Sequence, residues 1–146
     1  MAAHDMSAFD RIDKSIDIAA PAQRVWEFVS EPGWFINDGA YRTHEITRDG
    51  EVSLVRDPVH GDFGFRTVAL EAPRHAAFRW VGEGAGTTLV EFFVDARDGG
   101  STLRVVESGF ASLPGSRDER LAAFDGNSEG WDIELGVARA SCESAD

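Results

Sequence analysis

Glu107 is the acidic residue whose position most favours chemistry. It lies in the alternating segment Thr102–Phe110 and shares strand parity with Leu103 and Val105. If those two apolar side chains face the core, the carboxyl group points into an apolar interior, where it resists ionisation and can act as a general acid or base. The opposite parity would leave Glu107 in solvent, and a structural ion pair is a third reading; all three stay open.

Two arginines stand on other predicted strands and widen the chemistry that Glu107 could support. Arg66 and Arg79 could each form an ion pair with Glu107, or could hold an anionic group of a ligand. The sequence therefore makes Glu107, Arg66 and Arg79 the candidates for orienting a polar group.

The histidines and the cysteine do not form a metal-binding or nucleophilic pattern. His4, His44, His60 and His75 include no pair at the i, i+4 spacing of two ligands on a helix, and we expect no metal and surface histidines instead. The single cysteine, Cys142, has no assigned base and is expected on or just past the last turn of the C-terminal helix.

The aromatic side chains are the stronger indication of a binding site. Large apolar pockets are lined by such rings, with few polar groups to orient a ligand. The rings could instead simply fill the core, and this alternative stays open. The candidates are Trp34, Tyr41, Phe65, Phe78, Trp80, Phe92 and Trp131, with Leu135 beside them.

The longest element that must position these residues is a C-terminal helix over Arg117–Ala140. Apolar residues recur there at steps of three and four, from Leu121 to Leu135, and Ser116 with Glu119 forms a capping-box pattern. Several glycines interrupt the helix, and each costs about 1 kcal/mol relative to alanine. The helix therefore needs a surface to pack on.

A run of alternating segments supplies that surface. Tight turns such as Asp49-Gly50 predict antiparallel pairing, and helices at the ends of an antiparallel sheet predict an α+β domain. Two short helices, Pro21–Ser30 and Trp34–Ile36, follow the first strand. Strands are expected at Ile12–Ile18, Thr43–Arg48, Glu51–Arg56, Phe63–Leu70, His75–Val81, Thr88–Asp95 and Thr102–Phe110, with a glycine-rich loop at Gly82–Gly86.

Composition limits the partners and the compartment. The formal net charge of -12 repels phosphate backbones and anionic lipid, so we expect neither nucleic acid nor a membrane as partner. One cysteine excludes an internal disulfide and, with no apolar leader at the N-terminus, favours the cytoplasm. We expect a flexible arm over 1–9 and a single domain over 10–142.

The order of these elements, with particular residues in them, resembles a known family. The residues are Ile18-Ala19-Ala20-Pro21, Val25-Trp26, Trp34, Ala77–Trp80, Thr88–Phe92, Gly100–Leu103, Ser108–Phe110, Gly130-Trp131 and Leu135. Together they resemble the helix-grip fold of the SRPBCC (START-like) superfamily, and within it the branch named for activators of a heat-shock chaperone's ATPase. The resemblance implies a curved sheet of six or seven strands around the long helix, with an internal apolar cavity. The segment Asp57–Asp62 departs from the family's glycine-rich hairpin.

Three functions are compatible with the resemblance. The leading one is non-enzymatic binding of a small hydrophobic molecule between sheet and helix, with an apolar wall from Trp34, Phe78, Trp80 and Trp131. The second is a co-chaperone-like module that binds a heat-shock ATPase or another protein. The third is a polyketide cyclase-like enzyme that uses Glu107. No cofactor is implied, and a homodimer stays open.

Overall fold

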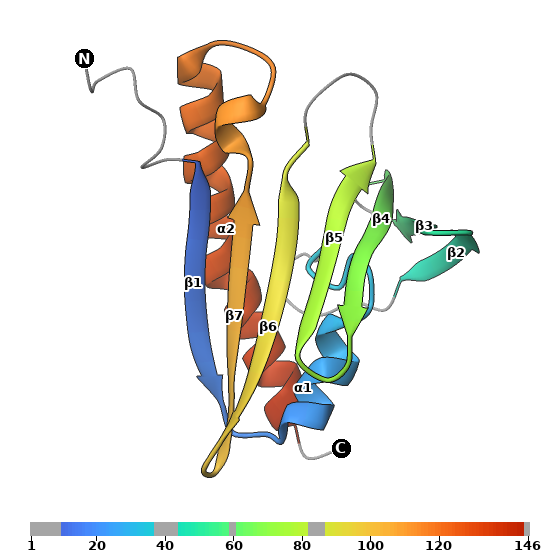
Figure 1. Ribbon diagram of the computed structural model, residues 1–146, viewed down its shortest axis with the longest axis vertical. Coiled ribbons are helices and arrows are strands. Elements are labelled where there is room, and N and C mark those ends of the chain that lie inside the picture. Colours follow the sequence, from blue (N-terminus) through green and yellow to red (C-terminus); the bar gives the residue numbers. More distant parts are fainter. Residues whose placement is uncertain (1–9, 37–43, 59–60, 82–86, 145–146) are drawn as a thin grey trace.

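The computed structural model describes residues 10–36, 44–58, 61–81 and 87–144. Within these residues, seven strands form one sheet in the order β1-β7-β6-β5-β4-β3-β2, and every neighbouring pair is antiparallel (Figure 1). The strands are β1 Arg11–Ile18, β2 Glu45–Asp49, β3 Val52–Asp57, β4 Gly61–Glu71, β5 His75–Val81, β6 Leu89–Arg97 and β7 Gly100–Ser108. The predicted arm over 1–9 and the loop Gly82–Gly86 lie outside the described residues.

Alternating side chains explain why these segments form strands. In the register of β6 with β7, Phe92 faces Val105 and Val90 faces Glu107, and all four side chains are buried. Apolar side chains at every second position bury one face of the sheet and leave the other face for charged groups. This alternation places Glu107 on the inner side, which confirms the first of the three readings of its parity.

Tight turns set the register of the hairpins. Gly50 and Gly99 sit in the β2–β3 and β6–β7 turns with φ of 65° and 79°, which favours glycine because it has no Cβ. At Gly100, the first residue of β7, glycine is required because a Cβ would overlap the backbone carbonyl oxygen of Ile18. The hairpin predicted at Asp49-Gly50 is confirmed.

The long helix α2 (Arg117–Glu143) begins at a capping box. Ser116 Oγ accepts from the Glu119 backbone N–H at 3.1 Å, and Glu119 Oε1 accepts from the Ser116 backbone N–H at 2.8 Å. Its last turn is held by Arg24, whose guanidinium donates to the carbonyls of Ser141 and Cys142. These bonds satisfy carbonyls that a helix end leaves open, so the helix extends past Ala140, where we expected it to end.

Among the described residues between β1 and β2 there is one α-helix. Helix α1 (Ala22–Val29) is amphipathic and buries Val25, Trp26 and Val29. The second short helix expected at Trp34–Ile36 is instead a pair of turns over residues 31–36, because only Trp34 and Ile36 donate short-range bonds there, to Glu31 and Gly33. The turns still bury both side chains.

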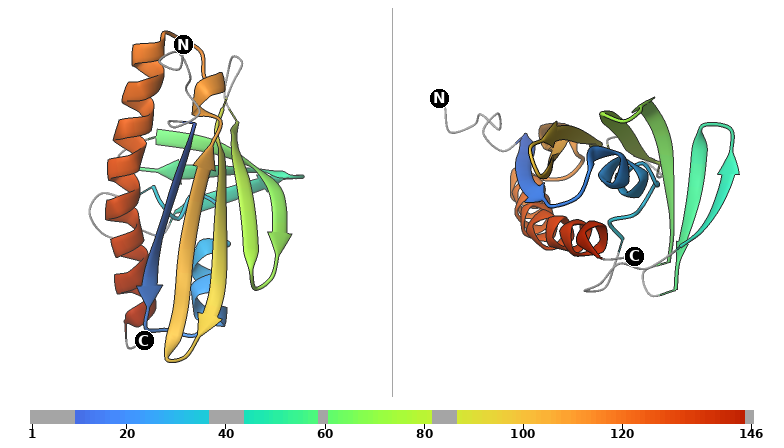
Figure 2. Two further views of the ribbon diagram at one scale, coloured as in Figure 1. Left: turned by 60° about the vertical axis from the view of Figure 1, so that its left-hand side comes forward. Right: turned by 90° about the horizontal axis from the view of Figure 1, so that it is seen from below.

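Helix α2 lies along the inner face of the sheet. Helix α2 runs beside β1 in Figure 1 and in the left view of Figure 2. Seen from below, the sheet curves around α1, and α2 lies next to β1 (Figure 2). The core fills the space between these layers. The predicted α+β architecture is confirmed. Among the described residues, no helix combines the length and the apolar character needed to cross a membrane.

Candidate functional site

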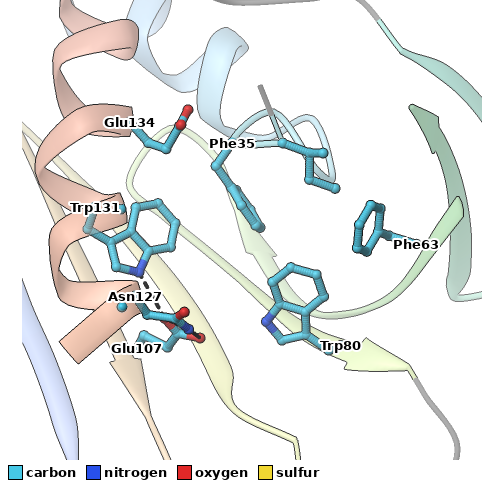
Figure 3. A pocket seen from close by; sticks show the side chains of 10 residues that line it. Phe35, Phe63, Trp80, Glu107, Asn127, Trp131 and Glu134 are labelled. Carbon is cyan, nitrogen blue, oxygen red and sulfur yellow. Dashed lines mark hydrogen bonds between the residues drawn. The ribbon is translucent and has the colours of Figure 1, made fainter. Parts of the chain in front are cut away.

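A cavity of about 230 Å³ opens between α2, β4, β5 and the turns over 31–36. Four aromatic side chains line it, and a single buried carboxyl group lies at one edge (Figure 3). The lining residues are Phe35, Ile36, Phe63, Trp80, Glu107, Gly126, Asn127, Gly130, Trp131 and Glu134.

Glu107 is the polar centre of this cavity. Its side chain comes from the end of β7, and only 1% of the residue is exposed. Thr88 Oγ1 donates to Oε2 at 2.5 Å, Trp131 Nε1 donates to Oε1 at 2.8 Å, and Asn127 Nδ2 lies 3.2 Å from both oxygens. Hence β7, α2 and the residue just before β6 all contribute to the surroundings of one carboxyl group.

The neighbours of Glu107 are groups that can donate hydrogen bonds to it. The indole of Trp131 and the amide nitrogen of Asn127 can only donate, and the hydroxyl of Thr88 donates as well. Hydrogen bonds from such donors to a carboxylate are charge-assisted and therefore stronger than bonds between neutral groups. The arrangement therefore suits Glu107 to electrostatic orientation of a ligand.

The aromatic rings surround the open space at different angles. Phe35 lies between the two indoles, with its ring centroid 5.1 Å from that of Trp131 and 5.7 Å from that of Trp80. Figure 3 shows Trp131 and Trp80 on opposite sides of the space, with Phe63 beyond Trp80. Such packing holds each indole in place, since rings in edge and tilted contact restrict one another.

Most of the other predicted aromatic site residues belong to the core beneath the cavity. Trp34, Phe65, Phe78 and Phe92 are at most 1% exposed, and Leu135 is 3% exposed. None of them lines the open space. They support the lining side chains, as the contact of Trp34 with Phe35 shows. The predicted residue Tyr41 lies outside the described residues.

The two predicted arginines do not reach the cavity. Arg66 is exposed and donates to Glu51, and Arg79 is exposed and donates to the carbonyl of Thr87. Each follows a buried aromatic residue, Phe65 or Phe78, so the strand's alternation turns it to the outer face. The structure therefore places both arginines away from the cavity.

Sequence reasoning missed several lining residues. Phe35 and Ile36 come from the turns, where no regular period marks a pocket, whereas Phe63 shares its strand face with the predicted residue Phe65. On the helix, in contrast, the spacing could have predicted two lining residues. Asn127 is four residues before Trp131 and Glu134 is three residues after it, so all three lie on the same face. Gly126 and Gly130 share that spacing and leave the helix wall open, because a Cβ at either position would meet nothing within 4 Å.

The histidines differ from the surface placement that we expected. His44 is buried, and its Nε2 donates to Asp57 at 3.1 Å; His75 is partly buried and contacts Glu71 and Glu91. In the described ranges, no three His, Cys, Asp or Glu side chains are grouped as metal ligands would be. His4 and His60 lie outside those ranges.

Cys142 is buried in the last turn of α2, close to its expected place. Burial raises the pKa of its thiol to about 11, and the negative charge of Glu143 acts in the same direction. The thiol is therefore protonated near neutral pH, and a protonated thiol is a poor nucleophile.

Comparison with known proteins yields the fold. No protein-family profile matches the chain, and no curated protein matches its sequence. Solved structures do match: MLL2253 from Mesorhizobium loti has a TM-score of 0.71 at 16% identity, covering 93% of this chain and 98% of that one.

Two further matches carry more informative names. The Aha1 dimer from Colwellia psychrerythraea has a TM-score of 0.68 at 15% identity, covering 91% of this chain and 96% of that one. CalU16 from Micromonospora echinospora has a TM-score of 0.61 at 17% identity, covering 90% of this chain and 73% of that one. At such low identity the likeness extends to architecture alone, and it identifies the curved antiparallel sheet with its long C-terminal helix as a helix-grip fold.

Proposed function

We propose that this protein binds a small, largely apolar molecule in the cavity between the sheet and α2. The observation that carries the proposal is a 230 Å³ cavity walled by aromatic side chains, with one buried carboxylate at its edge. A cavity that is mostly apolar and holds few polar groups is the usual design of a small-molecule site. Trp131, Trp80, Phe35 and Phe63 form the apolar wall, and Glu107 orients the ligand.

A purely structural role for Glu107 is the main competing explanation, and the helix glycines allow a test that leaves Glu107 intact. Gly130 lies on the cavity wall, and Gly136 lies on the same helix away from the cavity; a Cβ meets open space at both. Leucine at Gly130 would project into the cavity, whereas leucine at Gly136 would project elsewhere with the same change in composition.

The measurement is a fluorescence titration with the neutral apolar probe N-phenyl-1-naphthylamine. We expect saturable binding to the wild type and to Gly136→Leu, and at least tenfold weaker binding to Gly130→Leu. Circular dichroism melts establish that both variants are folded. Absence of binding to the folded wild type, or equal binding to both variants, would reject the cavity as a ligand site.

A co-chaperone role is the second candidate, and likeness to the Aha1 dimer favours it. It predicts that the purified protein raises the turnover of a heat-shock ATPase, and that Gly130→Leu leaves this effect unchanged. A cyclase-like role for Glu107 is less well supported, because both carboxylate oxygens already accept from neighbouring donors.

A further inference from the structure

We infer that the ligand of this cavity carries a permanent positive charge, as a quaternary ammonium group held beside Glu107 and between the indoles of Trp131 and Trp80. The inference rests on the proposed function and specifies its ligand class. It is carried by the charge of Glu107, by the kind of donors around it, and by the rings that face the same space.

The first step is that Glu107 brings a carboxylate into the interior with no cationic partner among the described residues. Its donors are a hydroxyl, an amide and an indole, all of them neutral. In the described part of the chain, no arginine, lysine or histidine pairs with it, and the residues that line the cavity include none of these types. A buried charge without a countercharge is costly, so a cation in the cavity would be strongly favoured.

The second step is the form of that cation. Each oxygen of Glu107 already has two contacts. Oε1 accepts from Trp131 and Asn127, and Oε2 accepts from Thr88 and Asn127. A carboxylate oxygen has about two lone-pair sites, so little capacity remains for a ligand that must donate hydrogen bonds. A quaternary ammonium group donates none and is attracted by charge alone.

The third step is that the cavity wall contains aromatic rings, which attract cations. Cations are stabilised near aromatic rings, most strongly near tryptophan, and aromatic cages for quaternary ammonium groups use this attraction. Here the plane of Phe35 is tilted by 53° to that of Trp131 and by 72° to that of Trp80, so the rings close the space from different directions. Figure 3 shows Glu107 at the edge of the space that these rings enclose.

An anionic ligand fits the same site poorly. Glu107, which lines the cavity, would repel it. The formal net charge of -12 adds a repulsive field around the whole molecule. A neutral ligand would bind through the rings but would leave the charge of Glu107 uncompensated.

The test compares three probes of nearly equal shape: choline, its neutral isostere 3,3-dimethylbutan-1-ol, and the anion 3,3-dimethylbutanoate. Binding is followed by proton–nitrogen NMR at the indole N–H of Trp131, which donates to Glu107. We expect choline to bind at least tenfold more tightly than the alcohol, and the anion to bind most weakly. Equal or weaker binding of choline would overturn the inference.

Two glutamine variants separate the local charge from the overall charge. Glu107→Gln should remove the preference for choline, measured as the ratio of the choline and alcohol dissociation constants within the same variant. Glu129→Gln removes the same charge from an exposed position on α2 outside the cavity, and should leave the preference intact. Should Glu107→Gln fail to fold, Gly130→Leu takes its place, and choline binding that survives this obstruction would refute the site.

The outcomes distinguish the two proposals. If N-phenyl-1-naphthylamine binds at the cavity and choline shows no preference over the alcohol, the binding function stands and the charge inference fails. If neither the neutral probe nor any of the three small molecules binds, the proposed function fails and the inference fails with it.

Discussion

At the scale of single residues, the cavity depends on one carboxylate and the donors that hold it. Glu107 could be singled out from the sequence because it shares parity with apolar neighbours on a strand. Its partners could not, since Thr88 precedes β6 and Asn127 and Trp131 lie on α2, and they meet Glu107 only when helix and sheet pack. We expected Arg66 and Arg79 to orient a polar group, but each is adjacent to a residue that faces the core, so both arginines lie on the outer face of the sheet.

Trp131→Phe tests the hydrogen bond to Glu107. The substitution keeps a ring in the cavity wall but removes the N–H that donates at 2.8 Å. We expect the free energy of unfolding to fall by about 1–3 kcal/mol, because a buried carboxylate loses a donor. Denaturant melts measure the change, and the same substitution in a Glu107→Gln background should cost markedly less. Equal costs in the two backgrounds would show that only ring packing was lost.

Cys142 should be unreactive in the folded protein. With its pKa raised by burial to about 11, the thiol stays protonated at pH 8, whereas an ordinary thiol is partly ionised there. Iodoacetamide should therefore label it far more slowly than it labels the urea-unfolded chain. Rapid labelling under native conditions would contradict the buried placement.

The same shift sets the direction of a pH effect on stability. The folded state holds the thiol proton more tightly than the unfolded state, whose pKa is near 9.0. The contribution of Cys142 is therefore present below pH 9 and is lost as the pH rises toward 11. Cys142→Ala should remove this part of the alkaline destabilisation, as thermal melts across that range can show.

At the scale of elements, the sequence was most informative where a period or a turn is local. The strands could be predicted from alternating apolar residues, and the hairpins from turn glycines. The start of α2 could be predicted from the capping box of Ser116 with Glu119. The end of α2 and the turns over 31–36 were misjudged because they depend on tertiary contacts. Arg24 extends the helix from a distant segment, and burial against the sheet folds residues 31–36 into turns.

Ser116→Ala tests the start of α2. Removing the hydroxyl leaves the backbone N–H of Glu119 without its acceptor, so we expect the free energy of unfolding to fall by about 1 kcal/mol. Ser116→Thr keeps an acceptor and should cost less than half as much. Chemical denaturation of the three proteins side by side gives the comparison, and equal losses for both variants would mean that the cap is not the cause.

Glycine substitutions in two elements should have opposite effects. Gly136→Ala adds a methyl group that meets nothing within 4 Å, so helix propensity should stabilise the protein by about 0.5–1 kcal/mol. Gly100→Ala adds a methyl group that collides with backbone atoms of Ile18 and Ala19. It should lower the free energy of unfolding by several times the amount that Gly136→Ala raises it. Thermal melts test both, and a stable Gly100→Ala protein would contradict the β1–β7 register.

At the scale of the whole molecule, the acidic surface and the inward carboxylate act in the same direction. A formal net charge of -12 attracts cations from solution before any contact forms, and salt screens that attraction over about 10 Å at 0.1 M. Raising sodium chloride from 20 to about 500 mM should therefore weaken choline binding several-fold and leave 3,3-dimethylbutan-1-ol unaffected. Calorimetric titrations at each ionic strength provide the measurement, and salt-independent choline affinity would argue against a charged ligand.

Because Gly126 and Gly130 place no side chain in the cavity, substitutions at these two positions could change its volume. Neither position supports the fold through a side chain, and both border the cavity. Alanine, valine or a larger residue there would yield a graded set of receptors, each with a smaller chamber built on an unchanged backbone. A natural lineage or a protein engineer could change the size of the accepted molecule at these two codons while leaving the rest of the binding apparatus as it is.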